Sequence, residues 1–318
     1  MKLSVIVPCY NEANTIATQL EALAKQAWSE PWEVIVSDNG STDDSLAIVE
    51  QYRSKLPHLR IVDASTKRGA PHAINVGVQA ATGDAVAVCD ADDEVAPGWV
   101  AAIGEALARH DFVASRFDFT KLNEPWAVAA RSCGYGTCGQ ENGLQKIGHP
   151  PYLPFAGGCG LGVKKSMHDA VGGHDESLPY FHDPEYCFKI QLLGVELHYV
   201  PEAVVHIRCH HTFKGIFHQA RLWAAYGVTV YKKYKDVSHR NVSQPWRRYI
   251  SSWRDFLLIF VKWGVVLSLT PLYFTNRTAV LQHLPKPRSK GDIGVMVWRL
   301  GCLIGQLQGS IKNWVPPV

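Results

Sequence analysis

The sequence predicts an α/β protein with a mostly parallel central sheet flanked by helices, followed by a helical C-terminal extension. Short runs rich in Val and Ile alternate with amphipathic stretches over the first third of the chain, as in strand–helix–strand units. Hydrophobic residues make up 47% and charged residues 19% of the 318 residues, a balance typical of a globular chain and not of a disordered one. Residues 226–318 then change character and carry many Trp and Arg residues.

Four short apolar runs are predicted to be buried parallel strands, and the stretches between them to be helices. The strands are Leu3–Val7, Val34–Ser37, Leu59–Val62 and Ala85–Cys89. Apolar residues at helical spacing, with a capping residue near each start, indicate helices over Thr15–Ala27, Asp43–Lys55 and Pro71–Ala81. A long irregular insertion is expected from Ser115 to Pro154, after which periodicity returns from Gly160 to Val205. Ligands of parallel sheets bind beyond the carboxyl ends of the strands, so a site is expected in those loops.

The loop after the second strand offers a carboxylate. Asp38 is followed by Asn39 and Gly40, a combination typical of a tight turn. We favour a ligand role for Asp38, because a carboxylate there can accept hydrogen bonds from a base N–H or a ribose hydroxyl. For Asp43 we favour the alternative, in which the side chain caps the next helix.

The fourth strand is followed by four carboxylates in five positions, in the run Asp90-Ala91-Asp92-Asp93-Glu94. These charges would repel one another without a counterion, and a hard cation such as Mg²⁺ or Mn²⁺ prefers oxygen ligands. A solvated acidic turn is the alternative. The cation is favoured because Asp38, Lys67 and Arg68 follow other strands of the same sheet, and the two basic residues suit a diphosphate.

Four ordered motifs resemble the inverting glycosyltransferases of family 2. They are VIVPCYNE, VIVSDNGSTDDS, KRGAPHAINVGVQAATGDAVAVCDADD and GGCGLGVKKSMHDAVGGHDESLPYFHDPEYCFKIQLLGVELHYVPEAVVHIR. The resemblance implies a GT-A fold and a metal-dependent transfer from a UDP-, GDP- or dTDP-linked sugar to a hydroxyl acceptor. The resemblance covers roughly the first 210 residues apart from the Ser115–Pro154 insertion. Together with the change of composition it predicts three regions: residues 1–115 bind the nucleotide-sugar, residues 116–225 bind the acceptor and carry catalysis, and residues 226–318 form the helical extension.

The resemblance further implies roles for particular residues. The nucleotide would be contacted by Pro8, Tyr10, Glu12, Asp38, Lys67 and Arg68. Asp90 and Asp92, with Ala91 between them, would form an Asp-x-Asp metal-binding pair in which Asp92 is the favoured direct ligand. His206, at a strand end, is a further candidate ligand, with a structural role as the alternative. Gly157 and Gly158 would let a sugar lie against the backbone.

The same resemblance makes Asp183 the general base that takes the proton of the acceptor hydroxyl. Taken alone, the run His182-Asp183-Pro184 also fits a helix N-cap before a proline. The family usually has Glu where this chain has His182, so a nucleotide-sugar-binding protein without transfer activity is the alternative function. The segment Gln219–Trp223 differs in spacing from the Gln-x-x-Arg-Trp motif of processive members, which predicts a non-processive enzyme.

Other function classes are disfavoured. The net charge is only +3, which does not favour nucleic-acid binding, and no Gly-x-Gly-x-x-Gly follows the first strand, as a nicotinamide-dependent oxidoreductase would require. The apolar run Phe256–Leu272 contains Lys262 and is short for a membrane span. This run and a predicted helix over Gly294–Ile311 either lie in a membrane interface or pack on protein. The expected location is the cytoplasm, with peripheral contact to the inner membrane face under the first alternative.

Overall fold

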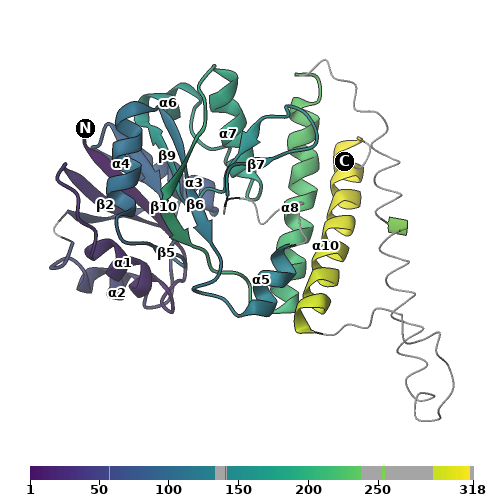
Figure 1. The fold of residues 1–318 in the computed structure, drawn as a ribbon, viewed down its shortest axis with the longest axis horizontal. Coiled ribbons are helices and arrows are strands. Elements are labelled where there is room, and N and C mark those ends of the chain that lie inside the picture. Colours follow the sequence, from purple (N-terminus) through teal and green to yellow (C-terminus); the bar gives the residue numbers. More distant parts are fainter. Residues whose placement is uncertain (57, 133–139, 141, 238–252, 255–288, 316–318) are drawn as a thin grey trace, which may run out of the picture. The chain divides into compact units, whose positions relative to one another are not determined.

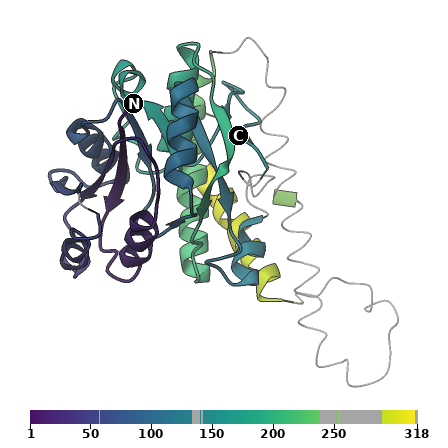
Figure 2. The ribbon, with the colours of Figure 1, turned by 60° about the vertical axis from the view of Figure 1, so that its left-hand side comes forward.

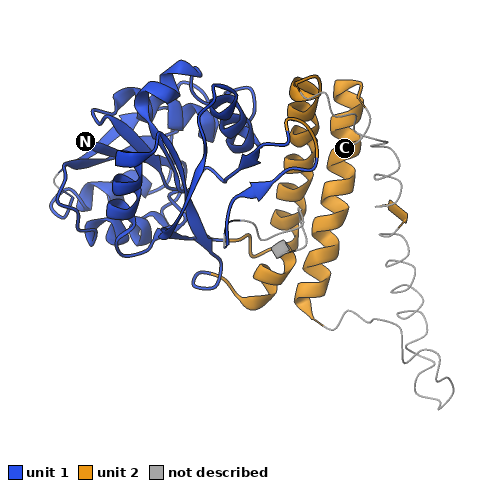
Figure 3. Cartoon of the chain, turned by 45° about the horizontal axis from the view of Figure 1, so that its top comes forward, with its two compact units in different colours: residues 1–122, 139–148, 152–208 blue, residues 123–138, 149–151, 209–318 orange. Residues whose placement is uncertain are grey.

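The computed structural model describes the chain except for residues 57, 133–139, 141, 238–252, 255–288 and 316–318 (Figure 1). The chain divides into two compact units (Figure 3). The first contains residues 1–122, 139–148 and 152–208, and the second contains residues 123–138, 149–151 and 209–318. Residues 209–225 therefore group with the C-terminal helices, whereas the sequence placed them with the middle region.

Among the described residues, the first unit is built on an eight-stranded sheet with the order β3-β2-β1-β4-β9-β6-β10-β5. The strands are β1 (Leu3–Cys9), β2 (Trp32–Asp38), β3 (Leu59–Asp63), β4 (Ala85–Val88), β5 (Glu94–Val95), β6 (Phe112–Asp118), β9 (Leu161–Lys164) and β10 (His198–His206). β9 runs antiparallel to β4 and β6, and β5 runs antiparallel to β10, while the other neighbours are parallel. The mostly parallel sheet and the four predicted strands are confirmed.

Helices lie on both faces of this sheet (Figure 2). They are α1 (Ile16–Ala24), α2 (Ser45–Gln51), α3 (Ala70–Ala80), α4 (Trp99–Arg109), α6 (Lys165–Ala170) and α7 (His182–Leu192). Right-handed crossovers from β1 to β2 to β3 place α1 and α2 on one face, and the return from β3 to β4 places α3 on the other. Gly77 lets α3 approach β1 closely, because a Cβ there would lie 2.5 Å from Cγ2 of Ile6.

The irregular insertion starts later than predicted. Ser115 lies inside β6, is fully buried, and accepts a 2.9 Å hydrogen bond from the indole N–H of Trp99. The small residues Ala114 and Ser115 and the exposed Arg116 interrupt the apolar run of β6, so its pattern does not stand out in the sequence. Beyond Asp118 the described part of this segment holds α5 (Pro125–Ser132), β7 (Gln145–Lys146) and β8 (Pro154–Phe155).

The second unit contains α5, α8 (Phe213–Tyr234) and α10 (Lys290–Asn313). α10 packs closely on α8 because Gly301, Gly305 and Gly309 face α8; a Cβ at Gly305 would lie 2.0 Å from the carbonyl oxygen of Arg221. The predicted helix Gly294–Ile311 is confirmed and extends further at both ends, whereas the run Phe256–Leu272 lies outside the described residues. None of the described helices combines the length and the apolarity that a membrane-spanning segment needs.

Candidate functional site

A pocket of about 470 Å³ opens in the first unit where β1, β2 and β4 end. Its lining comes from the end of β1, the loops after β1 to β4 and the start of α3: Pro8, Cys9, Tyr10, Glu12, Asn39, Arg68, Gly69, Ala70, Asp90, Ala91 and Asp92. These loops meet because their strands are parallel, so their carboxyl ends share one edge of the sheet. The sequence predicted seven of these residues as site residues and missed Cys9, Asn39, Gly69 and Ala70.

An aromatic ring and a cation lie together in the pocket. The guanidinium of Arg68 lies 3.5 Å from the ring centroid of Tyr10, and its Nη1 donates a 2.8 Å hydrogen bond to the carbonyl of Asn39. The Asn39 side chain accepts from the N–H of Gly69 at 2.9 Å and donates to the carbonyl of Lys67 at 2.8 Å. Asn39 thereby holds the loop that carries Arg68. Its position between a strand-end Asp and a glycine was the available signal in the sequence.

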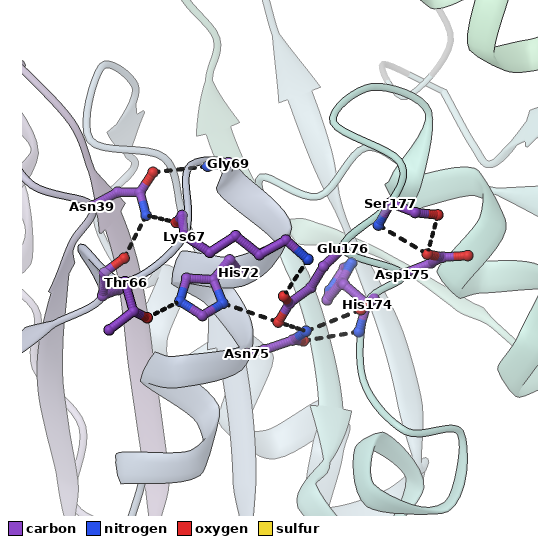
Figure 4. A network of polar contacts seen from close by, with 11 residues as sticks. Asn39, Thr66, Lys67, Gly69, His72, Asn75, His174, Asp175, Glu176 and Ser177 are labelled. Atoms are coloured by element: carbon purple, nitrogen blue, oxygen red, sulfur yellow. Dashed lines mark hydrogen bonds and ion pairs between the residues drawn. The ribbon is translucent and has the colours of Figure 1, made fainter.

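Six predicted site residues do not line the pocket: Asp183, Gly157 and Gly158, which are described below, and Asp38, Lys67 and His206. Asp38 is 7% exposed, and its carboxylate accepts hydrogen bonds from the N–H groups of Gly40 and Ser41, which close the turn after β2. The ammonium of Lys67 binds Glu176 at 2.9 Å instead of facing the pocket (Figure 4). His206 Nδ1 lies 2.6 Å from an oxygen of Asp118.

The acidic loop after β4 gathers carboxylates into a small space. Ligand atoms of Asp90, Asp93 and Cys159 lie within 4.8 Å of one another, and Asp92 lines the adjoining pocket. Burial and then the charges of Asp92 and Asp183 raise the pKa of Asp90 to about 7. Crowded, desolvated carboxylates of this kind are stabilised by a divalent cation, so the donor set fits Mg²⁺ or Mn²⁺.

Arg208 fixes this acidic loop. The sequence did not predict Arg208 as a site residue. Its backbone N–H donates a 2.7 Å hydrogen bond to Asp93, and its Nε donates a 2.8 Å bond to the carbonyl of Asp92. Asp93 is only 2% exposed, so Arg208 holds the acidic loop on its inner side, away from solvent. A single Arg after a strand carries no pattern that would mark it in advance.

Asp183 lies in the first turn of α7, where the positive end of the helix dipole favours a carboxylate. The N-cap residue is Phe181, so the alternative that Asp183 caps the helix is wrong. The imidazole Nδ1 of His182 lies 2.7 Å from Asp183 Oδ1. Although burial raises the pKa of Asp183, the charge and hydrogen bond of His182 and the Gly158 N–H outweigh it, and the net shift is downward.

The two predicted glycines lie against other protein groups. A Cβ at Gly158 would be 2.7 Å from Asp183 Oδ1, and one at Gly157 would be 3.1 Å from the ring of Phe117. The Gly157 N–H also donates a 2.6 Å hydrogen bond to the side chain of Gln140. Gly158 is therefore required for the close approach of the chain to Asp183.

Comparisons with known proteins agree with this geometry. The profile of the family described as "Glycosyl transferase family 2" matches residues 4–169. The chain is 44% identical to the uncharacterized glycosyltransferase YibD of Escherichia coli over 96 residues, which are 30% of this chain and 27% of that relative, so the match spans about a quarter of the relative's length.

Two solved structures share the fold. The mannosyltransferase PcManGT of Pyrobaculum calidifontis, solved with GDP-Man and Mn²⁺, is 19% identical with a TM-score of 0.57, over 95% of this chain and 86% of that chain. Residues 1–349 of Staphylococcus aureus TarS, solved with UDP-GlcNAc, are 18% identical with a TM-score of 0.51, over 99% of this chain and 93% of that chain. The expected fold is thereby confirmed.

Proposed function

The chain belongs to glycosyl transferase family 2, and we propose that it moves a sugar from a nucleotide-diphosphate donor to an acceptor hydroxyl. The observation that carries this proposal is the single pocket in which Tyr10, Arg68 and the acidic loop meet. Asp183 is the candidate base for the same reaction, and its charge contributes, after burial and Asp92, to the raised pKa of Asp90 in that loop. We further propose that the transfer inverts the anomeric carbon and is non-processive.

We propose that different residues of the pocket bind different parts of the donor. The exposed ring of Tyr10 offers a surface for the base, and Arg68 offers a cation for the diphosphate. A divalent cation would be held by Asp90 and Asp92, with Asp93 and Cys159 beside them, and when bound it would stabilise the departing diphosphate. His206 is bound to Asp118 and is left out of this ligand set.

Asp183 supplies the base in the proposed reaction. The acceptor oxygen forms a bond to the anomeric carbon from the face opposite the diphosphate, and the bond from that carbon to the diphosphate oxygen breaks. The proton of the acceptor hydroxyl passes to the carboxylate of Asp183, whose lowered pKa keeps it ionised at neutral pH.

The proposal is tested by measuring thermal stability and transfer with UDP-, GDP- and dTDP-sugars, with and without Mn²⁺. A donor that binds only the folded state raises the melting temperature, and we expect one nucleotide class to do so mainly in Mn²⁺. In the Arg68→Ala variant the donor dissociation constant should rise about tenfold, because a charge-assisted hydrogen bond to phosphate is lost.

Lys67→Ala is the matched control, since Lys67 is the neighbouring cation but binds Glu176 outside the pocket lining. It should leave the donor dissociation constant unchanged; equal losses in both variants would place both cations on the diphosphate. Donor binding without hydrolysis or transfer to any acceptor would favour the alternative of a binding protein without activity.

Gly158→Ala is expected to lower the transfer rate about 100-fold while donor binding stays intact, because a displaced catalytic group loses its alignment. The added Cβ would lie 2.7 Å from Asp183 Oδ1, and the backbone at Gly158 is not left-handed, so only this contact changes. Gly148→Ala is the control, since a Cβ there meets no atom within 4 Å. Steady-state kinetics and calorimetric donor binding measure both variants; an unaltered rate in Gly158→Ala would contradict the placement of Asp183.

A further inference from the structure

A pair of buried histidines lies behind Asp183. His174 is 4% exposed and His182 is 9% exposed. Their Nδ1 atoms lie 3.2 Å apart, and the same Nδ1 of His182 lies 2.7 Å from Asp183 Oδ1. Nδ1 of His174, Nδ1 of His182 and Oδ1 of Asp183 can each accept a hydrogen bond, and these three atoms lie around one position. The proton of one imidazole can occupy that position.

The chemistry of these atoms decides where the proton lies. Nδ1 of His182 faces a carboxylate, and two lone pairs at 2.7 Å would repel, so Nδ1 of His182 carries the proton. His174 then faces an N–H and must present an unprotonated Nδ1, which leaves its own proton on Nε2. Burial, and then the charges of His182, His168 and Lys189, keep the pKa of His174 well below its ordinary value, so this lone pair persists.

His174 is itself held rigidly. Its ring stacks on Tyr186 with the centroids 3.9 Å apart and the planes 14° from parallel. Its backbone N–H donates to Asn75 Oδ1 at 2.8 Å, and its carbonyl accepts from Asn75 Nδ2 at 2.9 Å (Figure 4). Asn75 belongs to α3, which packs on the sheet, and its amide also donates to Glu176 at 3.1 Å. Asn75 of α3 therefore fixes the backbone of His174.

We propose that His174 is a positioning residue for the transfer: its Nδ1 lone pair accepts from Nδ1–H of His182 and so fixes the tautomer and orientation of the imidazole that lies 2.7 Å from Asp183 Oδ1. This inference rests on the proposed role of Asp183 as the base. An imidazole presents different atoms when its ring flips or its tautomer changes, so it needs a partner that fixes both.

Other charges also act on this pair. Asp183, Asp90 and Glu185 favour the protonated form of His182 and outweigh the opposing effect of burial, so its pKa is raised. After burial and His182, the charges of His168 and Lys189 disfavour the protonated form of His174. A substitution of His174 leaves all of these neighbouring groups in place. A change seen on replacing His174 therefore reports the loss of its Nδ1.

Two substitutions test the inference. His174→Phe keeps the stacking on Tyr186 and removes Nδ1, and we expect a fall in kcat of about 10- to 100-fold, with the donor dissociation constant unchanged. The acid limb of the pH–rate profile should move to higher pH, because a less well paired Asp183 is protonated more readily. His174→Asn places an amide oxygen near the position of Nδ1 and should restore part of kcat and return the acid limb toward its wild-type position.

His168→Phe is the matched control, because His168 is a second buried histidine that contacts Tyr186, through a 2.9 Å hydrogen bond, whereas it is His174 that pairs with His182. It should lower stability and leave kcat and the acid limb in place. An equal kinetic loss in His168→Phe, or no gain in His174→Asn over His174→Phe, would show a packing role and overturn the inference. If Asp183→Asn retains full activity, the proposed function fails instead.

The tautomers can be observed without any variant. In ¹⁵N-histidine-labelled wild-type protein, long-range ¹H–¹⁵N correlation spectra should show His182 protonated at Nδ1 and His174 protonated at Nε2 only. His174 protonated at Nδ1 would overturn the inference. Stoichiometric Zn²⁺ binding that is lost in His174→Phe would also overturn it, since these three residues would then be metal ligands.

Discussion

Asp183→Asn is expected to lower kcat for transfer by about 10²- to 10⁴-fold, the range that a general base contributes. The amide cannot take the proton of the acceptor hydroxyl, yet it keeps the size of the side chain beside Gly158 and His182. Donor binding should persist, because Asp183 does not line the pocket that contains Tyr10 and Arg68. Steady-state kinetics and calorimetric titration with the donor separate these two effects.

The control for this substitution is Asp169→Asn. Asp169 is an exposed carboxylate on α6, so its replacement removes the same charge without reaching the site. It should leave kcat and the donor dissociation constant unchanged. Wild-type turnover in the Asp183→Asn protein would show that another group, or water, accepts the proton.

Asp92→Asn is expected to reduce transfer by about 10³-fold or more, since a bound cation contributes several kcal/mol to the stabilisation of a leaving diphosphate. Asp92 lines the pocket, and after burial its charge is a further cause of the raised pKa of Asp90 and of Glu12. Nucleotide binding should become weaker and lose its dependence on Mn²⁺. Titrations with UDP and GDP, in Mn²⁺ and in EDTA, measure this change.

Glu94→Gln provides the matched control for Asp92. Glu94 belongs to the same acidic run, but its carboxylate binds Lys121 at 2.6 Å and does not line the pocket. It should retain the Mn²⁺ dependence of nucleotide binding and most of the activity. If Asp92→Asn instead kept wild-type turnover, the assignment of the cation site to Asp92 would be wrong.

Residues close together in the chain could be predicted from the sequence. The strands β1, β2 and β4 follow from short runs of Val, Ile and Ala, because a strand buried on both faces needs apolar residues throughout. The edge strand β3 is only partly buried, and its apolar run is shorter. The pocket edge follows from the parallel arrangement, which brings the loops with Tyr10, Arg68 and Asp92 together. β6 was missed because Ser115 is polar, and the burial of Ser115 depends on Trp99, which lies on a different element.

The sequence by itself therefore determined the fold class, the family and the loops that meet at the site, since each depends on local pattern and on the topology of parallel sheets. Only the tertiary structure decided which side chain each candidate contacts. It placed Lys67 on Glu176, Arg208 on the acidic loop and His174 on His182. These partners lie on separate elements far apart in the chain, and hydrogen bonds depend on distances and directions that exist only once the elements have packed.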